Sequence, residues 1–576
     1  VFTITAPNSN TDRTITLPDA SVTLGTDATK LPLAGGTMTG AIVLGTNTVG
    51  GLQITTTATS NIGLGATTLD SITTGDYNVG LGDTTMTATT SGGDNTAVGN
   101  AAMRSNTTGN TNSAFGGAAL LDNTTGTDNT AVGALSLANN TTASNNVAVG
   151  KSALEANTTG ASNTAVGRVS MYTNTTGSNN VAVGAVSLYL NTTGANNVAF
   201  GVDALHYNTT ADNNSAFGYN ALGANTTGAE NVAVGHEAFL ANTTASTGVA
   251  IGKSALKANT TGANNIGIGY LALTTNTTGA SNVAVGRNAL ELNTTASNNT
   301  AVGMEALYAN TTGSENTALG RDAMKASTTG NQNSSVGVSA LQNNTTGSAN
   351  VAMGYFSLLA NTTGVNNTSI GRGALSTITT AVNNTAVGHG ALSGSTADGN
   401  TAVGLAAGSG ITSGQYNTTI GLVAGTVSNL TGSFNSSFGY NANPSAVGSS
   451  GQITLGDGNV GALRCNASLS GLSDQRDKTD IVDLAYGLNF INQTRPVTFK
   501  WETRDGNTKD GKTHNGFLAQ ELLELGNNDQ HNLVIEENPD KLEASYGNLL
   551  PMMVKAIQEL STKNDALEAR ITALEA

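Results

Sequence analysis

Apolar and small residues recur in this chain with a period of seventeen. A glycine falls at every seventeenth position from Gly65 to Gly388, and the series continues to Gly456 with spacings of 16, 17, 18 and 17. A large apolar residue precedes each glycine, and the residue before that is almost always small, as in Ala148 and Val149. A fixed period of this length is typical of proteins in which each repeat stacks on the next.

Each repeat predicts one coil of a parallel β-roll, built from two short strands and two turns. Because neighbouring strand residues point to opposite faces, we expect Val149 to enter the coil and Ala148 to lie on a face that another backbone approaches. Glycine and the recurring phrase Asn-Thr-Thr-Gly are expected at corners with positive φ. Proline is absent between Pro32 and Pro444, which fits a ladder that uses every N–H. Stacked Asn and Thr side chains are expected to form ladders of their own.

The repeat offers few large side chains for a core of its own. About two large residues per coil stand against a backbone entropy cost of about 1–2 kcal/mol per residue. We therefore expect the rolls to bury their small-residue face against copies of themselves. The phrase Asn145-Asn-Val-Ala-Val-Gly150 resembles the repeat in the head of trimeric autotransporter adhesins. That resemblance covers roughly residues 61–460 and implies a mainly β, homotrimeric parallel β-roll or solenoid.

The first sixty residues have a different pattern. Phe2–Thr5 and Thr14–Leu17 alternate apolar and hydroxyl residues, which predicts strands. The segment Leu31–Gly40 resembles one found in bacteriophage tail fibres, and a glycine-rich linker is the alternative. We expect residues 1–60 to form a β segment of a fibre shaft. Since the chain begins at Val1, we also expect a missing N-terminal part that attaches to other tail proteins.

Composition and charge narrow the class of protein. Charged residues make up 11% and the net charge is −15. Low charge and abundant glycine also occur in disordered chains, but these have no reason to keep a strict period. The negative charge argues against a nucleic-acid partner. No apolar run is long enough to span a membrane, so we expect no membrane insertion. The single Cys465 excludes a disulfide framework within the chain.

Several familiar motifs are better explained by the repeat itself. The Asn-Thr-Thr phrase matches the N-glycosylation sequon, but turn-forming asparagines explain it. Calcium-binding β-rolls need a recurring aspartate, which is sparse and out of phase here. Ice-binding solenoids need Thr-x-Thr on one face, whereas the threonines of this repeat are adjacent and point to opposite faces. The histidines show no metal-ligand spacing. We therefore predict no metal and no cofactor.

Near the C-terminal end of the repeat, Gly432–Tyr440 contains two phenylalanines and a tyrosine. These aromatic residues are interpreted either as part of a receptor-binding tip or as a cap on the last coil. Residues 461–472 are expected to link the rod to the next domain. Charged residues are then concentrated in residues 473–576, which also hold the only tryptophan.

Four ordered motifs in residues 473–576 resemble the intramolecular chaperone domain at the C-terminus of phage tail spikes, tail fibres and endosialidases. They are Ser473-Asp-x-Arg-x-Lys-x-x-Ile481, Arg495-Pro-Val-Thr-Phe-Lys-Trp501, Gly516-Phe-Leu-Ala-Gln-Glu521 and Tyr546-x-x-Leu549. The resemblance implies that this domain directs folding of the trimer. It also implies self-cleavage between Leu472 and Ser473.

The first of these motifs contains the residue types that such a cleavage needs. A serine hydroxyl becomes a nucleophile when a base takes its proton, and a lysine with a depressed pKa can be that base. We therefore assign Ser473 as nucleophile and Lys478 as base. Asp474 and Arg476 are expected to position the scissile bond or the dyad. Taken alone, the Ser-Asp pair would indicate only a turn or a helix cap.

The last segment, from about 546 to 576, predicts a coiled coil. Its apolar positions follow 3-4-3-4 spacing and comprise Leu550, Met553, Ile557, Leu560, Asn564, Leu567, Ile571 and Leu574, with Asn564 as the one polar member. So short a coil is marginal alone but is expected to hold as a trimer beside a folded domain. An Asn at this position fixes register at some cost in stability.

Together these features predict a structural protein: a distal tail fibre of a bacteriophage virion. We expect it to attach to a host receptor, either a glycan or an outer-membrane component, and to release its chaperone domain in a single self-cleavage. The alternative is a trimeric adhesin of a bacterial cell surface, against which stands the lack of a C-terminal membrane anchor. A glycan-degrading enzyme is the third hypothesis, but no acid pair in a cleft-forming domain supports it.

Overall fold

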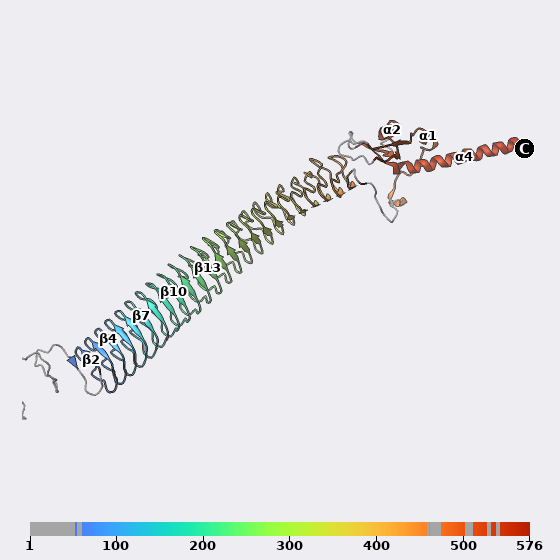
Figure 1. Ribbon diagram of the computed structural model, residues 1–576. Helices are drawn as coiled ribbons and strands as arrows, with labels where there is room; N and C mark the ends of the chain where they lie inside the picture. Colours follow the sequence, from blue (N-terminus) through green and yellow to red (C-terminus); the bar gives the residue numbers. More distant parts are fainter. Residues whose placement is uncertain are drawn as a thin grey trace, which may run out of the picture. The chain divides into compact units, whose positions relative to one another are not determined.

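The computed structural model describes residues 52–53, 60–457, 460, 474–501, 511–526, 531–536 and 542–576. The expected shaft segment, apart from residues 52–53 and 60, and the expected linker 461–472 therefore lie outside the described residues. The described chain is mainly β, with a long solenoid followed by short helices and strands and a C-terminal helix (Figure 1).

The rod is a parallel β-solenoid whose coils follow the period of seventeen. Each strand pairs in parallel with the strand one coil away, as Ala148 pairs with Ala131 and with Ala165, and β1 is antiparallel to β2. A coil contains one strand of three residues and otherwise turns, so the predicted second strand was wrong.

The strand bounds are β1 Leu52–Gln53, β2 Ile62–Leu64, β3 Val79–Leu81, β4 Thr96–Val98, β5 Ser113–Phe115, β6 Thr130–Val132, β7 Val147–Val149, β8 Thr164–Val166, β9 Val181–Val183, β10 Val198–Phe200, β11 Ser215–Phe217, β12 Val232–Val234, β13 Val249–Ile251, β14 Ile266–Ile268, β15 Val283–Val285, β16 Thr300–Val302, β17 Thr317–Leu319, β18 Ser334–Val336, β19 Val351–Met353, β20 Thr368–Ile370, β21 Thr385–Val387, β22 Thr401–Val403, β23 Thr418–Ile420, β24 Ser436–Phe438 and β25 Ile453–Leu455.

The interior of the coil takes the small strand residue, not the large one. Ala148 is fully buried, whereas Val149 is only partly buried on the outer face. The reason is the leucine four residues after the marker glycine: Leu154 is fully buried and fills the narrow interior. At Gly267, where most coils have alanine, an added Cβ would lie 3.2 Å from Cγ of Leu256. The predicted facing of the strand, with its small-residue face turned toward other copies, was therefore wrong.

The marker glycine stands where two backbones meet. Gly150 has φ of 137°, and a Cβ there would lie 2.4 Å from the carbonyl oxygen of Gly167 in the next coil. Both the dihedral and the close approach exclude any other residue. By contrast, the glycine of the Asn-Thr-Thr-Gly phrase does not have a positive φ; the same position is alanine at Ala143. In the coil of Gly150, the other left-handed residues are Ser152, Leu154 and Ser162.

Two columns of buried asparagine join the coils, as the ladder prediction expected. In the first, the Asn157 side-chain amide donates to Oδ1 of Asn140 at 2.9 Å and to the Gly160 carbonyl at 2.9 Å. In the second, Oδ1 of Asn146 accepts the backbone N–H of Asn163 at 2.9 Å. Threonine hydroxyls add a third ladder, which runs from Thr107 to Thr362 through most coils. In it, each hydroxyl donates to a backbone carbonyl one coil on. These bonds satisfy polar groups that burial would otherwise penalise.

The residues after the rod form a small α+β unit. It contains η1 Gln475–Asp477, α1 Leu488–Ile491, β26 Val497–Phe499, β27 His514–Gly516, α2 Ala519–Glu524, β28 Val534–Ile535, β29 Glu543–Ala544, η2 Tyr546–Leu549 and α4 Leu550–Glu575. Strands β26 and β27 pair antiparallel, as do β28 and β29. Phe490, Leu522, Leu533, Val534, Leu549 and Met552 form its core. Among the described residues, no helix is long and apolar enough to cross a membrane.

Candidate functional site

The described part of the predicted cleavage motif is an exposed, hydrogen-bonded turn. Oδ1 of Asp474 caps η1 by accepting the backbone N–H of Arg476 at 2.9 Å. The Arg476 guanidinium returns to the same carboxylate, with Nε 3.1 Å from Oδ1 and Nη2 2.5 Å from Oδ2. This side-chain contact holds the pKa of Asp474 below its usual range and raises that of Arg476. Asp474 therefore stays ionised and fixes the turn.

The proposed base follows directly after this turn. The backbone N–H of Lys478 donates to the carbonyl of Gln475 at 3.2 Å, and the Lys478 side chain is exposed. Leu472 and Ser473 lie outside the described residues. The structure thus places Asp474, Arg476 and Lys478 on one turn, and the assignment of a nucleophile and a base stays a prediction.

The three later motifs, which begin at Arg495, Gly516 and Tyr546, contact one another in the structure. The Arg495 side chain pairs with the Glu521 carboxylate, and Nε lies 3.0 Å from Oε2. The Tyr546 ring packs edge-on against Phe517 with centroids 5.8 Å apart. A Cβ at Gly516 would lie 2.6 Å from the Tyr546 hydroxyl oxygen. Residues far apart in sequence therefore build one local structure, which explains why that position is glycine.

Helix α4 uses only one side to hold the small unit. Met552 and Ala556 are buried, and the Glu559 carboxylate accepts the backbone N–H of Leu488 at 2.8 Å, which ties α4 to α1. The apolar residues of the heptad pattern are instead exposed in the single chain: Leu550, Met553, Ile557, Leu560, Leu567, Ile571 and Leu574. An apolar stripe of this length on a helix is typical of a coiled-coil seam.

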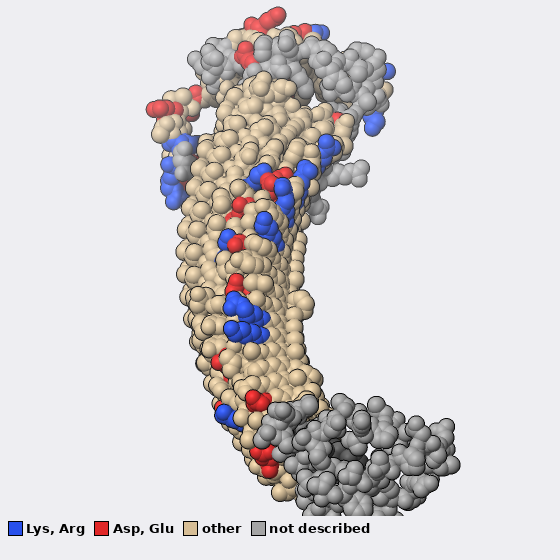
Figure 2. All heavy atoms as spheres, turned by 90° about the vertical axis from the view of Figure 1, so that its left-hand side faces the viewer, with Lys and Arg blue, Asp and Glu red and all other residues tan. Residues whose placement is uncertain are grey.

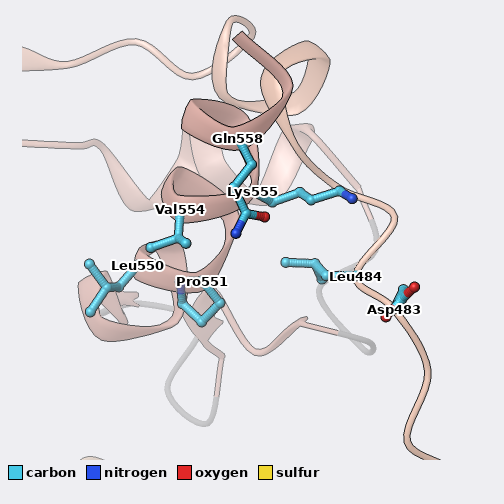
Figure 3. A pocket seen from close by; sticks show the side chains of 7 residues that line it. All are labelled: Asp483, Leu484, Leu550, Pro551, Val554, Lys555 and Gln558. Atoms are coloured by element: carbon cyan, nitrogen blue, oxygen red, sulfur yellow. The ribbon is translucent and has the colours of Figure 1, made fainter. Parts of the chain in front are cut away.

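An open hollow of about 620 Å³ lies beside the first turns of α4. It is lined by Asp483, Leu484, Leu550, Pro551, Val554, Lys555 and Gln558 (Figure 3). The Lys555 and Gln558 side chains come from the helix, whereas Asp483 and Leu484 come from the segment that follows the predicted cleavage motif. Leu550 lines this hollow and also belongs to the exposed stripe of α4. The hollow and the stripe therefore form one exposed surface.

The rod also carries an apolar row on the outer face of its sheet. The row is formed by the residue before each marker glycine, and its most exposed members are Leu64, Phe115, Val132, Phe200, Phe217, Val234, Ile251, Val302, Leu319, Met353, Ile370, Val403, Ile420, Phe438 and Leu455. Elsewhere, Figure 2 shows charged side chains gathered in a narrow stripe along the visible face of the rod. Ion pairs such as Lys257 with Glu237, at 2.8 Å, cross from one coil to another.

The sequence analysis identified only one member of an aromatic pair near the C-terminal end of the rod. Tyr416 and Phe434 stack with ring centroids 5.3 Å apart and an angle of 16° between their planes. The cluster Gly432–Tyr440 includes Phe434, but its partner lies one coil earlier. Aligning the coils on the marker glycine would have revealed the pair, because both residues stand five positions before that glycine.

Comparison with known proteins identifies one segment of the chain. Residues 473–530 match the model of the family described as chaperone of endosialidase. This match and the β-solenoid body fit a protein of the tailspike and endosialidase type. No curated protein and no solved structure matches the chain. No group of three or more His, Cys, Asp or Glu that could hold a metal occurs within the described ranges.

Proposed function

We propose that this chain is a distal tail-fibre protein of a bacteriophage and that it acts as a homotrimer in host attachment. The observation that carries the proposal is the order of its parts: a solenoid of seventeen-residue coils followed by a segment that matches the chaperone of endosialidase. The rod supplies length and surface. The C-terminal unit supplies the alignment of three chains.

The physics of the repeat explains why alignment is needed. Coils of nearly identical sequence allow two chains to associate one whole coil out of step, and such a slip loses the contacts of only one coil. The C-terminal unit lies outside the repeat, so three copies of it can associate in only one register. The exposed heptad stripe of α4 would bring three chains together in that register, and the three rods would then associate coil by coil.

Self-cleavage would release the aligning unit once the rod has formed. In this step the Ser473 hydroxyl attacks the carbonyl carbon of Leu472 while Lys478 takes its proton. The Oγ–C bond forms, the C–N bond breaks, and the freed amino group receives the proton. Water then hydrolyses the resulting ester. The Asp474–Arg476 pair would hold the turn directly after the scissile bond.

Gel electrophoresis under denaturing conditions tests the cleavage. The full chain should lose its C-terminal fragment, residues 473–576, and the Ser473→Ala chain should stay whole. Lys478→Gln should slow the loss, whereas Lys555→Gln, a lysine on α4, should leave it unchanged. A wild-type chain that stays whole would exclude the cleavage and leave the chaperone role standing.

Attachment is tested with labelled fibres and living cells. The trimer should adsorb to some members of a panel of bacterial strains and fail to adsorb to derivatives with altered surface glycans. Adsorption to none of the strains would count against the proposed function.

A further inference from the structure

Two stacked aromatic residues of the rod occupy a backbone conformation that disfavours bulky side chains, although neither residue is buried. Tyr416 has φ of 56° and Phe434 has φ of 62°. Bulky residues rarely adopt this left-handed region. Most of the leucines that adopt it, such as Leu154, are fully buried, and their burial offsets the strain. Tyr416 and Phe434 are instead 54% and 65% exposed, so packing within the chain does not offset theirs.

The same position in the other coils shows what the fold alone requires there. Apart from Tyr77, it is held by small or polar residues, for example Asn366 and Asn383. Acidic residues occupy it at Asp94, Asp128, Glu230 and Glu315. A contact between copies of the rod along this column would bury those carboxylates at a high cost. The column therefore faces solvent, and the aromatic pair is not explained by self-association.

The neighbouring coils leave room for the pair. At Gly399, one coil before Tyr416, a Cβ would lie 2.5 Å from ring atom Cδ1 of that tyrosine. The Tyr416 ring therefore lies over a glycine, and the Phe434 ring stacks on Tyr416. One coil after Phe434 stands Gly451, where a Cβ would meet nothing within 4 Å. No side chain at that position covers the Phe434 ring, so the pair ends in an open aromatic face.

Unused hydrogen-bonding groups flank the rings. Two residues after each aromatic residue, the hydroxyls of Thr418 and Ser436 lie on the outer strand face. Next to Tyr416 is the exposed side-chain amide of Gln415. Within the part of the chain that the structure describes, these three groups make no side-chain hydrogen bond. A flat aromatic face bordered by hydroxyl and amide groups suits a sugar, whose C–H face packs on the ring while its hydroxyls form hydrogen bonds.

We propose that Tyr416 and Phe434 form a stacking platform for a pyranose ring of a bacterial surface glycan, with Gln415, Thr418 and Ser436 as hydrogen-bonding partners. This inference rests on the proposed host attachment and gives it a site and a ligand class. The three copies in a trimer would present three such platforms, so weak single contacts would add to firm attachment to a polysaccharide.

The test replaces each ring with the residue that the column has elsewhere. Tyr416→Asn and Phe434→Asn remove the aromatic faces and relieve the backbone strain, so the melting temperature of the rod should stay the same or rise. The matched control is Tyr77→Asn, since Tyr77 stands in the same column with φ of 59° and 62% exposure but has Asp94 as its neighbour one coil on.

Binding is measured on a printed array of purified bacterial O-polysaccharides and capsular polysaccharides. Wild type and the Tyr77 variant should bind the same glycans, and each platform variant should bind them at least about tenfold more weakly. Equal binding by the platform variants would overturn the proposal, as would a wild type that binds no glycan. A fall in melting temperature without loss of binding would assign the pair to capping the rod instead.

Adsorption to cells separates this inference from the proposed function. If wild type and both platform variants adsorb equally to the same strains, attachment stands and the platform fails. If wild type binds glycans through the platform but adsorbs to no strain, the platform stands and host attachment fails.

Discussion

At the scale of single residues, the marker glycine carries the strictest requirement in the rod. Gly150 combines φ of 137° with a carbonyl oxygen of the next coil 2.4 Å from where a Cβ would stand. The sequence predicted the positive φ here from the recurrence of glycine alone. The close approach of two backbones was not predictable, because it depends on the distance between coils and leaves no other trace in the sequence.

Gly150→Ala should therefore destabilise its surroundings by about 2–4 kcal/mol. Because repeat proteins open locally, the loss should appear as faster amide hydrogen exchange in the coils on either side. The matched control is Gly117→Ala, since a Cβ there would meet nothing within 4 Å and the same position is already alanine at Ala134. A Gly150→Ala chain with the protection of wild type would contradict the backbone contact.

At the scale of elements, the sequence predicted the parallel strands and their register but not which strand face is inside. The prediction assumed that the larger side chain seeks the interior. The interior is instead filled from the turn side by residues such as Leu154, which leaves space opposite only for the methyl group of Ala148. A periodicity shows which positions share a face, but the volume between two elements decides which face is buried.

The first asparagine column has a weak joint between Asn106 and Asn361, at the one position in that range that is not asparagine. Ser327 stands there, and neither its hydroxyl nor Oδ1 of Asn310 has a hydrogen-bond partner. On the other side, Asn344 donates only to the Gly347 carbonyl. Buried polar atoms without partners cost free energy, so the column is interrupted at this coil.

Ser327→Asn should restore the column and stabilise the coils around it by about 1 kcal/mol. Hydrogen exchange of the amides in residues 310–344 should become slower. Ser327→Ala serves as control, because it removes the unpaired hydroxyl but leaves Oδ1 of Asn310 without a donor. Equal protection in the two variants would mean that the ladder contributes little.

At the scale of the whole molecule, the proposed trimer depends on a helix that buries little in the single chain. The heptad spacing predicted the apolar stripe of α4, and the structure leaves that stripe exposed. It also shows what the sequence could not, namely that Met552 and Ala556 on another side of the helix hold it to the small unit. One face of the helix thus packs on its own domain, and the apolar stripe stays exposed.

Ile557→Glu should prevent the three chains from aligning, because it places a charge in the middle of the proposed seam. Light scattering of the freshly expressed chain should show monomers or aggregates instead of trimers. Thr562→Glu adds the same charge at an exposed position outside the heptad pattern and should leave the trimer intact. Trimers of the Ile557 variant would show that the rod aligns without α4.

The close contact between marker glycines also has a consequence for the gene. Every coil contacts the next through the same backbone surfaces. One coil can therefore take the place of another, whereas a residue in an ordinary core has fixed neighbours. Recombination between two repeated stretches of DNA would remove or add whole coils while preserving the reading frame and the hydrogen-bonded ladder. The length of the rod is thus a heritable copy number, which selection can adjust without redesigning the fold or the C-terminal unit.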